Sequence, residues 1–413
     1  MRTTVYGSWH LASVYAVGLA SLGHEVRLLT HSPVRERYEA GEPPVFEPGL
    51  KEAIARLQSE RKLIFTSDIP ADGDDVCFFA EDCKVTESGV DLAAFRELFD
   101  PVAASGRFGT IAVSSQLPLG TCRELAAAHP ALRIVYFPEF LRLGTALDRF
   151  LRPDFIVVGG EHTAAAAVLD FFAAQEAPKF TVTLEEAEMT KHAANAFVAT
   201  SVSFVSELTK FSERWNVNLE RIGAILRCDK RIGPKAYVMP GMGFSGETVE
   251  RDIRVLIGLA AKSGFDLPMF REVIAVNNEH NRFIERELAR RFPDMSGKKV
   301  GFLGATYRPS TSTLRGSLFA PLMDRLSAAG AAVLLFDPNI EASPMLVKSA
   351  DAAFDGADAV VVSVSKPAFR ELDFAALVAR MKTRVIIDAA NLLPLDVARS
   401  LGAEYCSIGR GTL

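Results

Sequence analysis

Two polar side chains in the segment from residue 183 to 215 are spaced so that both could act on one ligand. Lys191 and Asn195 lie four residues apart, and side chains with that spacing project from the same face of a helix, one turn apart. An ammonium group and an amide in that arrangement can hold or polarise a ligand oxygen. Two solvated residues near the start of a helix are the alternative, and the spacing alone does not exclude it.

A glycine-rich segment between residues 229 and 253 is the second place where the residue types suggest a site. Its glycines suit a loop that passes close to a ligand, and Arg231 and Lys235 place positive charge beside it. The length of the loop and its basic flank favour a binding loop over a plain connection. The glycines are Gly233, Gly241, Gly243 and Gly246.

The helix that must carry Lys191 and Asn195 is predicted over residues 183–215, which contain no Gly or Pro. Thr183, with Glu186 three residues later, is a capping box, in which each side chain caps a backbone N–H of the other residue. Apolar residues recur at mostly three- and four-residue steps, which predicts one buried stripe. The stripe is longer than one small domain can cover, so we expect a homodimer in which the helix packs on its symmetry mate. Its residues are Ala193, Phe197, Phe204, Leu208, Phe211 and Trp215.

The first thirty residues have the pattern of a dinucleotide-binding fold, with a strand at 3–7, a helix to Leu22 and a second strand. That fold needs three small residues, for the turn, for the approach of the pyrophosphate and for helix packing. Gly7, Trp9 and Ala12 stand at these positions. Gly7 and Ala12 suit them, whereas the Trp9 indole would occupy or border the space of the pyrophosphate.

The second strand ends without the acidic residue that binds the ribose of NAD, because Thr30 stands there. Thr30 with His31, Ser32 and Arg35 could instead hold a 2′-phosphate, so NADP is an alternative. These residues predict the architecture without deciding between NAD, NADP and no dinucleotide.

The whole chain is predicted to be an α/β protein of two doubly wound Rossmann-like domains, joined by the long central helix and a helical dimerisation region. Continuous apolar runs at both ends are typical of parallel strands. Arg308 and Arg315 follow the first strand of the second doubly wound half, where open sheets bind ligands, although isolated arginines are also common on surfaces. The predicted domains are 1–180, 181–296 and 297–413.

Composition narrows the class of protein. The chain of 413 residues is 49% apolar and 23% charged, as soluble proteins with two or three domains are. A net charge of −5 gives no sign of binding to nucleic acid or a membrane surface. We expect no signal peptide, because the N-terminus begins directly with a strand-like run, and no membrane span, because no apolar run is long enough. The cysteines are odd in number, scattered and without metal spacing, so we expect no metal site and a cytoplasmic location. They are Cys77, Cys83, Cys122, Cys228 and Cys406.

Five segments, in order along nearly the whole chain, resemble the UDP-glucose/GDP-mannose dehydrogenase family. They are FEPGL at 46–50, PEFLRLGTALDRFLRPD at 138–154, AEMTKHAANAF at 187–197, RIGPKAYVMPGMGF at 231–244 and YRPSTSTLRGS at 307–317. The resemblance implies an NAD-dependent enzyme that oxidises the C6 alcohol of a nucleotide-sugar to a carboxylate. It also implies a dinucleotide domain, a central dimerisation region and a C-terminal domain for a UDP-sugar, which is favoured over a GDP-sugar.

The same resemblance implies roles for individual residues. Glu139 matches the general base of thioester hydrolysis, and Lys191, Asn195 and Asp252 match the groups that polarise the C6 oxygen and hold a water. Arg231 matches an arginine that reaches the sugar nucleotide, often that of the neighbouring subunit. The implied substrate contacts are Phe140, Leu141, Arg231, Tyr237, Gly241, Gly243, Phe244, Gly246 and Arg308. The implied cofactor positions are Gly7, Trp9, Ala12, Thr30, Gln116 and Arg315.

The chain departs from the family pattern at the nucleophile. Where members read G-F-G-G-S-C-F-P-K-D, residues 243–252 read GFSGETVERD, so Thr248 replaces the cysteine that forms the thiohemiacetal and thioester. A thiol is partly ionised near neutral pH, whereas an aliphatic hydroxyl is not without a strong base. On the cofactor side, residues 81–84 replace an N-T-P-T-like segment, and Gln116 replaces a threonine. We expect the second oxidation to fail.

Three hypotheses follow. The first is a nucleotide-sugar-binding protein whose NAD-dependent four-electron oxidation is impaired or lost, acting as a regulator or partner subunit. The second is a two-electron alcohol or aldehyde oxidoreductase that uses Lys191 and Asp252. The third is an active UDP-sugar 6-dehydrogenase with unusual ligands, serving polysaccharide precursor synthesis. The sequence does not distinguish uracil from guanine, or glucose from other hexoses.

Overall fold

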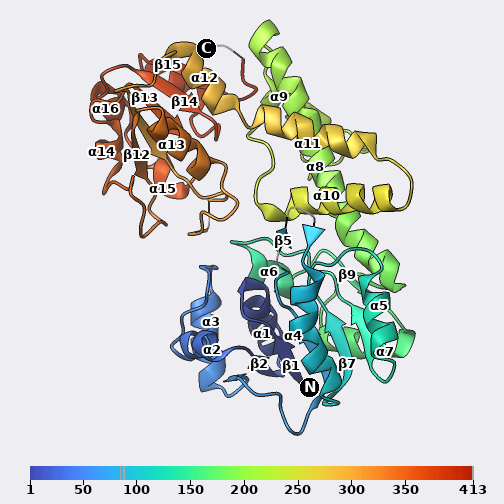
Figure 1. Ribbon diagram of the computed structural model, residues 1–413. Coiled ribbons are helices and arrows are strands. Elements are labelled where there is room, and N and C mark those ends of the chain that lie inside the picture. Colours follow the sequence, from blue (N-terminus) through green and yellow to red (C-terminus); the bar gives the residue numbers. More distant parts are fainter. Residues whose placement is uncertain (84, 87–88, 310, 412–413) are drawn as a thin grey trace. The chain divides into compact units, whose positions relative to one another are not determined.

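The computed structural model describes residues 1–411 except 84, 87–88 and 310, and it divides into two compact units (Figure 1). The first contains residues 1–194 and 254–263, and the second contains residues 195–253 and 264–413. Helices α8 (Leu184–Trp215) and α10 (Glu247–Lys262) contribute residues to both. The domain boundaries expected at residues 180 and 296 stay predictions.

The first unit is built on an eight-stranded sheet in the order β10-β9-β8-β7-β4-β1-β2-β3. Six adjacent strands of this sheet, in the order β3-β2-β1-β4-β7-β8, pair in parallel. This is the order of a dinucleotide-binding Rossmann sheet. The direction of winding reverses between β1 and β4, the point at which such sheets bind ligands. The strands are β1 (Arg2–Tyr6), β2 (Glu25–Leu29), β3 (Leu63–Thr66), β4 (Asp74–Phe79), β7 (Phe108–Val113), β8 (Arg133–Tyr136), β9 (Ile156–Gly159) and β10 (Lys179–Val182), with a ribbon of β5 (Val85–Thr86) and β6 (Gly89–Val90).

The apolar first helix of this unit, α1, packs against the sheet and against α3 and α6. Residues 11–20 of α1 are all buried, as expected for a helix that is apolar on every side and covered by other elements. Tyr15 of α1 packs edge-on against Phe78, Phe137 and Phe150. The helices are α1 (His10–Ser21), α2 (Ser32–Glu39), α3 (Leu50–Ser59), α4 (Leu92–Ala104), α5 (Thr121–Ala128), α6 (Ala146–Leu151), α7 (His162–Leu169) and the short 3-10 helix Asp170–Phe172.

Glu47 explains the FEPGL segment in structural terms. Its buried carboxylate accepts the backbone N–H groups of Gly144 and Ala146, both at 2.7 Å, and lies 2.9 Å from Nε2 of His10. The carboxylate therefore satisfies the free N–H groups at the start of α6 and ties three distant segments of the first unit together.

The second unit carries a five-stranded sheet in the order β12-β11-β13-β14-β15, with every neighbouring pair parallel. This is the other common doubly wound order, and its winding reverses between β11 and β13. The strands are β11 (Lys299–Leu303), β12 (Ala332–Phe336), β13 (Ala359–Val362), β14 (Val385–Asp388) and β15 (Glu404–Ser407). Further helices are α9 (Leu219–Leu226), α11 (Pro268–His280), α12 (Phe283–Arg291), α13 (Phe319–Ala328), α14 (Ala350–Phe354), α15 (Pro367–Arg370), α16 (Phe374–Ala379) and α17 (Leu395–Ser400).

The capping box of α8 is confirmed. The N–H of Thr183 donates to Oε2 of Glu186 at 2.8 Å, and the N–H of Glu186 donates to Oγ1 of Thr183 at 3.2 Å. The helix that follows extends to Trp215 as predicted. Within the described part of the chain, no helix is both long enough and apolar enough to cross a membrane.

The stripe of α8 does not face the interior of the chain, and the expectation of a buried stripe is wrong for the single chain. Phe197 is 73% exposed and Trp215 is 62% exposed, while Phe204 and Phe211 are each 50% exposed. The buried face consists mainly of small and hydroxyl residues. Their hydroxyls bond to backbone carbonyls, as Ser203 does to Val273 of α11 at 2.9 Å, so small residues let a neighbouring helix approach closely. These buried residues include Ala196, Ala199, Ser203, Ser206, Thr209 and Ser212.

Candidate functional site

Lys191 is held in the first unit by the residue predicted to be the general base. Its Nζ donates to Oε1 of Glu139 at 2.8 Å and to the backbone oxygen of Glu139 at 2.5 Å. The other carboxylate oxygen of Glu139 accepts the N–H of Leu141 at 2.8 Å, and the Lys191 ammonium lies 5.4 Å from the centre of the Phe140 ring. The structure thus places three other predicted residues, Glu139, Phe140 and Leu141, around Lys191, which is only 4% exposed.

Glu188, which the sequence analysis did not single out, fixes the start of α8 beside this pair. Its fully buried carboxylate accepts the N–H of Gly120 at 2.5 Å and that of Cys122 at 2.9 Å, at the start of α5. Burial raises the pKa of the Glu188 carboxyl above its ordinary value. In the sequence, the feature that could have identified Glu188 is its position three residues before Lys191, on the same face of the predicted helix.

Asn195 and Asp252 form a second pair, in the second unit. The side-chain amide of Asn195 donates to Oδ2 of Asp252, and Asp252 is completely buried. An amide that bonds one carboxylate oxygen orients the other, which is a useful property in a group expected to hold a water.

Thr248 is the second residue of α10 and is exposed. The N-terminus of a helix favours an anionic group, and it lowers the pKa of a cysteine placed there. The position therefore suits a thiolate, although the residue present is a threonine. The cysteines of the chain lie elsewhere, and burial raises the pKa of Cys77, Cys122 and Cys406.

The glycine loop is shaped by polar side chains at the C-terminal end of α11 and by Asn281, its C-cap residue, a support that was not predicted. The N–H of Gly243 donates to Oδ1 of Asn281 at 2.9 Å, and the side-chain amide of Asn277 donates to the backbone oxygen of Phe244 at 3.1 Å. A Cβ at position 243 would lie 2.2 Å from Oδ1 of Asn277, so any other residue there would require the Asn277 side chain to move. Nε2 of His280 lies 2.8 Å from the backbone oxygen of Gly241. In the sequence, the feature that could have indicated this support is the group of two asparagines and a histidine within residues 277–281.

We expect the stability of the protein to fall as the pH drops below about 6.5, partly through His280. Burial lowers the pKa of His280 below its ordinary 6.5, so the unfolded chain binds more protons than the folded one in that window. The free energy of unfolding therefore rises with pH there. His24 shifts in the same direction, so the informative measurement is urea unfolding of the unmodified protein and of His280→Gln between about pH 5 and about pH 7.5. An identical slope in both proteins would contradict the role given to His280.

The glycine loop is joined to the loop after β11. The N–H of Gly246 donates to the backbone oxygen of Gly316 at 3.0 Å, and a Cβ at Gly246 would lie 3.3 Å from the Tyr307 ring. The guanidinium of the half-buried Arg308 lies 5.6 Å from the centre of the same ring. Gly246 and Arg308, both predicted substrate contacts, are therefore connected through Tyr307.

A buried lysine supports that loop at the point where the second sheet reverses its winding. Nζ of Lys366 bonds Oδ1 of Asp337 at 2.9 Å, Oδ1 of Asn339 at 2.8 Å and the backbone oxygen of Pro309 at 3.2 Å. The loops after β11, β12 and β13 are thereby held together beside Arg308.

Two predicted arginines are turned outward in the single chain. The Arg231 side chain is 88% exposed and pairs with Asp229 at 2.6 Å, and Arg315 is also exposed. Tyr237 is half-buried. An arginine turned outward in the single chain is compatible with the implied contact to a neighbouring subunit.

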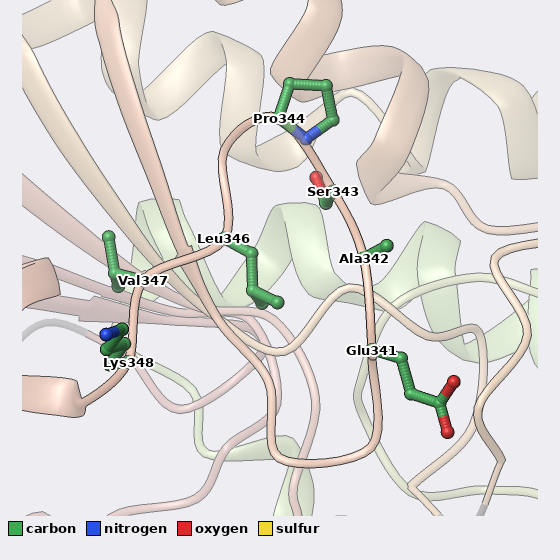
Figure 2. Close-up of a pocket in the computed structure, with 7 residues that line it drawn as sticks. All are labelled: Glu341, Ala342, Ser343, Pro344, Leu346, Val347 and Lys348. Carbon is green, nitrogen blue, oxygen red and sulfur yellow. The ribbon is translucent and has the colours of Figure 1, made fainter.

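A surface pocket of about 560 Å³ lies in the second unit (Figure 2). It is formed by one loop after β12, whose Leu346 forms a bridge with Leu335 of that strand. None of the predicted site residues lines this pocket, so we do not include it in the candidate site. The lining residues are Glu341, Ala342, Ser343, Pro344, Leu346, Val347 and Lys348.

At the dinucleotide end of the first unit, the turn after β1 is as tight as predicted. A Cβ at Gly7, whose φ is +151°, would lie 2.6 Å from the backbone oxygen of Ala80 and 2.7 Å from Cβ of Ala12. Glycine and a small residue are therefore both required. Trp9 is the N-cap residue of α1, is half-buried and makes no side-chain capping bond. Whether its indole covers the first turn stays a prediction.

The remaining cofactor positions partly fit a dinucleotide. Thr30 is 4% exposed, and its hydroxyl has no hydrogen-bond partner among the described residues, so a polar group is left over for a ligand. Gln116 is 7% exposed. The N–H of Ser8, by contrast, is already bonded to the carboxylate of Glu81. The strand, turn and first helix therefore fit a dinucleotide, while one N–H group of the turn is already bonded to Glu81.

Three consecutive parts of the chain match the three domains of a known protein family. Residues 1–173 match the NAD binding domain of the UDP-glucose/GDP-mannose dehydrogenase family, residues 185–279 its central domain and residues 301–394 its UDP binding domain. These matches support NAD as the cofactor and a UDP-sugar as the ligand.

Individual relatives extend over the full chain. A UDP-glucose 6-dehydrogenase of Rhizobium meliloti is 30% identical, over 99% of this chain and 100% of its own length. One of Pseudomonas aeruginosa is also 30% identical, over 99% and 98%. A solved UDP-glucose dehydrogenase from Pyrobaculum islandicum superposes with a TM-score of 0.87 at 28% identity, over 100% of this chain and 98% of its own. The chain therefore belongs to the UDP-glucose/GDP-mannose dehydrogenase family.

Proposed function

We propose that this protein binds a UDP-sugar and that the family's four-electron oxidation is impaired or lost in it at the second step. The observation that carries the proposal is Thr248 in the first turn of α10. A thiolate at that position would add to the aldehyde carbon and later leave as the thioester is hydrolysed. The threonine hydroxyl keeps its proton, so no thiohemiacetal forms and no thioester follows.

The sugar-binding side supports the first half of the proposal. Backbone groups of the glycine loop are held in place by side chains at the C-terminal end of α11, and the loop bonds to the segment that carries Tyr307 and Arg308. The match of residues 301–394 to a UDP binding domain supports a UDP-sugar as the ligand of this side.

A second candidate is a two-electron oxidoreductase that stops at the aldehyde or reduces it. The retained Lys191–Glu139 and Asn195–Asp252 pairs favour it, because a buried ammonium group can polarise a C6 oxygen in either direction of the reaction. NAD, when bound, would accept or supply the hydride. A complete four-electron dehydrogenase is the remaining alternative, and it requires a nucleophile other than a cysteine at position 248.

We also propose that the protein is a homodimer formed through the exposed aromatic face of α8. Four large aromatic side chains that are half or more exposed along one helix form a surface that water solvates poorly. A two-fold axis would bury the same face from both copies. Arg231, which is turned outward, would then be available to the neighbouring copy.

Calorimetric titration tests the ligand assignment. UDP and UDP-glucose should bind and raise the melting temperature, because a ligand of the native state stabilises it by mass action, whereas GDP-mannose should bind more weakly. Absence of binding by every nucleotide-sugar at millimolar concentration would sink the proposal and leave only a scaffold.

Arg231→Ala should weaken UDP-glucose binding by about 1.5–3 kcal/mol, the range for losing a charge-assisted hydrogen bond. Arg271→Ala is the matched control, because Arg271 is another exposed arginine of the second unit that pairs with an aspartate, Asp266. Equal affinities in the two variants would show that Arg231 does not reach the ligand.

A further inference from the structure

The turn that leads into α1 is bonded to a carboxylate of the protein itself. The backbone N–H of Ser8 donates to Oε2 of Glu81 at 2.9 Å. The Ser8 hydroxyl lies 2.9 Å from Oε1 and 3.0 Å from Oε2 of the same carboxylate. Glu81 follows β4, the strand next to β1 across the point where the sheet reverses, so it enters the ligand-binding edge of the sheet from the opposite side.

The carboxylate is built into this position and does not lie there as a free surface group. Glu81 is 8% exposed, and its backbone oxygen accepts the hydroxyl of the fully buried Ser115 at 2.6 Å. Burial raises the pKa of the Glu81 carboxyl, which means that water contributes little to its solvation. The Ser8 donors replace part of that lost solvation.

The bond to Ser8 places a negative charge directly before the N-cap residue of α1, Trp9, where a dinucleotide needs positive potential. A helix N-terminus offers unpaired N–H groups and a partial positive charge of about half an elementary charge, and both attract the pyrophosphate of NAD in Rossmann folds. The first turn of α1 contains no acidic residue of its own. Glu81 therefore supplies the only anion that the described residues place on the N–H of Ser8.

We propose that Glu81 is an internal competitor for the pyrophosphate of NAD and that it lowers the dinucleotide affinity of this chain. Bound NAD must displace the carboxylate from Ser8 or place its phosphates beside a buried negative charge, and either costs free energy. The inference rests on NAD as the cofactor and is independent of the chemistry at Thr248, because it concerns binding alone.

Glu81→Gln tests the proposal by calorimetric titration with NAD. The amide keeps the shape and one acceptor oxygen for Ser8 but removes the charge, so NAD should bind about tenfold more tightly than to the unmodified protein. Glu97→Gln is the matched control, since Glu97 is an exposed residue of α4 in the same unit. It removes the same net charge away from the turn and should leave NAD affinity within about twofold.

Further measurements separate a change in NAD binding from a failure of the variant to fold. UDP affinity and the melting temperature report on folding, and UDP affinity should be unchanged because the UDP-binding match lies in the other unit. If Glu81→Gln fails to fold, Glu81→Asn removes the same charge. The proposal is overturned if neither variant binds NAD more tightly, or if Trp9→Gly alone restores binding while the Glu81 variants do not. Failure of UDP-glucose to bind would count against the proposed function and not against Glu81.

Discussion

UDP-glucose incubated with NAD and the unmodified protein should yield no UDP-glucuronate. Trp9→Gly with Thr30→Asp should recover some NAD binding, because the first change clears the first turn of α1 and the second provides the carboxylate that binds the adenosine ribose. That double variant should still give no acid. Acid should appear only when Thr248→Cys is added, because only then does a thiolate exist to carry the thioester.

The products are separated by anion-exchange chromatography, and NADH is followed by its absorbance. The double variant without Thr248→Cys is the control, since it shares the restored cofactor site. Alkylation of the new thiol by iodoacetamide provides a second readout, because the first turn of α10 should lower its pKa. Release of two NADH per sugar by the unmodified protein would falsify the assignment of both sites.

Phe204→Glu should convert the protein from a dimer to a monomer in sedimentation at micromolar concentration. Full burial of a phenylalanine is worth about 1.5–3 kcal/mol, and Phe204 is already half-buried, so each copy can gain about half of that in a two-fold interface. An unpaired carboxylate in the same place adds a desolvation cost. Together these effects should weaken dimerisation by at least about a hundredfold.

Phe180→Glu is the control, because Phe180 of β10 has the same 50% exposure as Phe204 but lies away from the stripe. It should leave the dimer intact. The dimer proposal fails if the unmodified protein sediments as a monomer, or if Phe204→Glu and Phe211→Glu both remain dimeric.

Local features could be determined from the sequence because their causes lie within a few residues. The capping box of α8 depends on two side chains three residues apart, and the parallel strands follow from apolar runs between turns. The family segments gave Glu139 and Lys191 separate roles, but the pairing of these two side chains, 52 residues apart, was not predicted. Both doubly wound sheets are confirmed.

Which face of α8 packs against the rest of the chain was decided only by the tertiary structure. A three- and four-residue period identifies an apolar face but does not say whether the same chain or another one covers it. Here small and hydroxyl residues such as Ser203 face the neighbouring helix α11, which leaves the aromatic residues outside. The period identified the apolar face correctly, and the structure shows that the single chain leaves that face exposed.

Contacts between distant loops were likewise beyond the sequence. Glu81 and Ser8 are 73 residues apart, and their bond exists because β1 and β4 are neighbours in the sheet. The support of Gly243 by Asn277 and Asn281 depends in the same way on where α11 passes. The sequence shows which residue types are present at such positions, but hydrogen bonds are short-ranged and directional. Which donor meets which acceptor is therefore settled only when the strands and helices have packed.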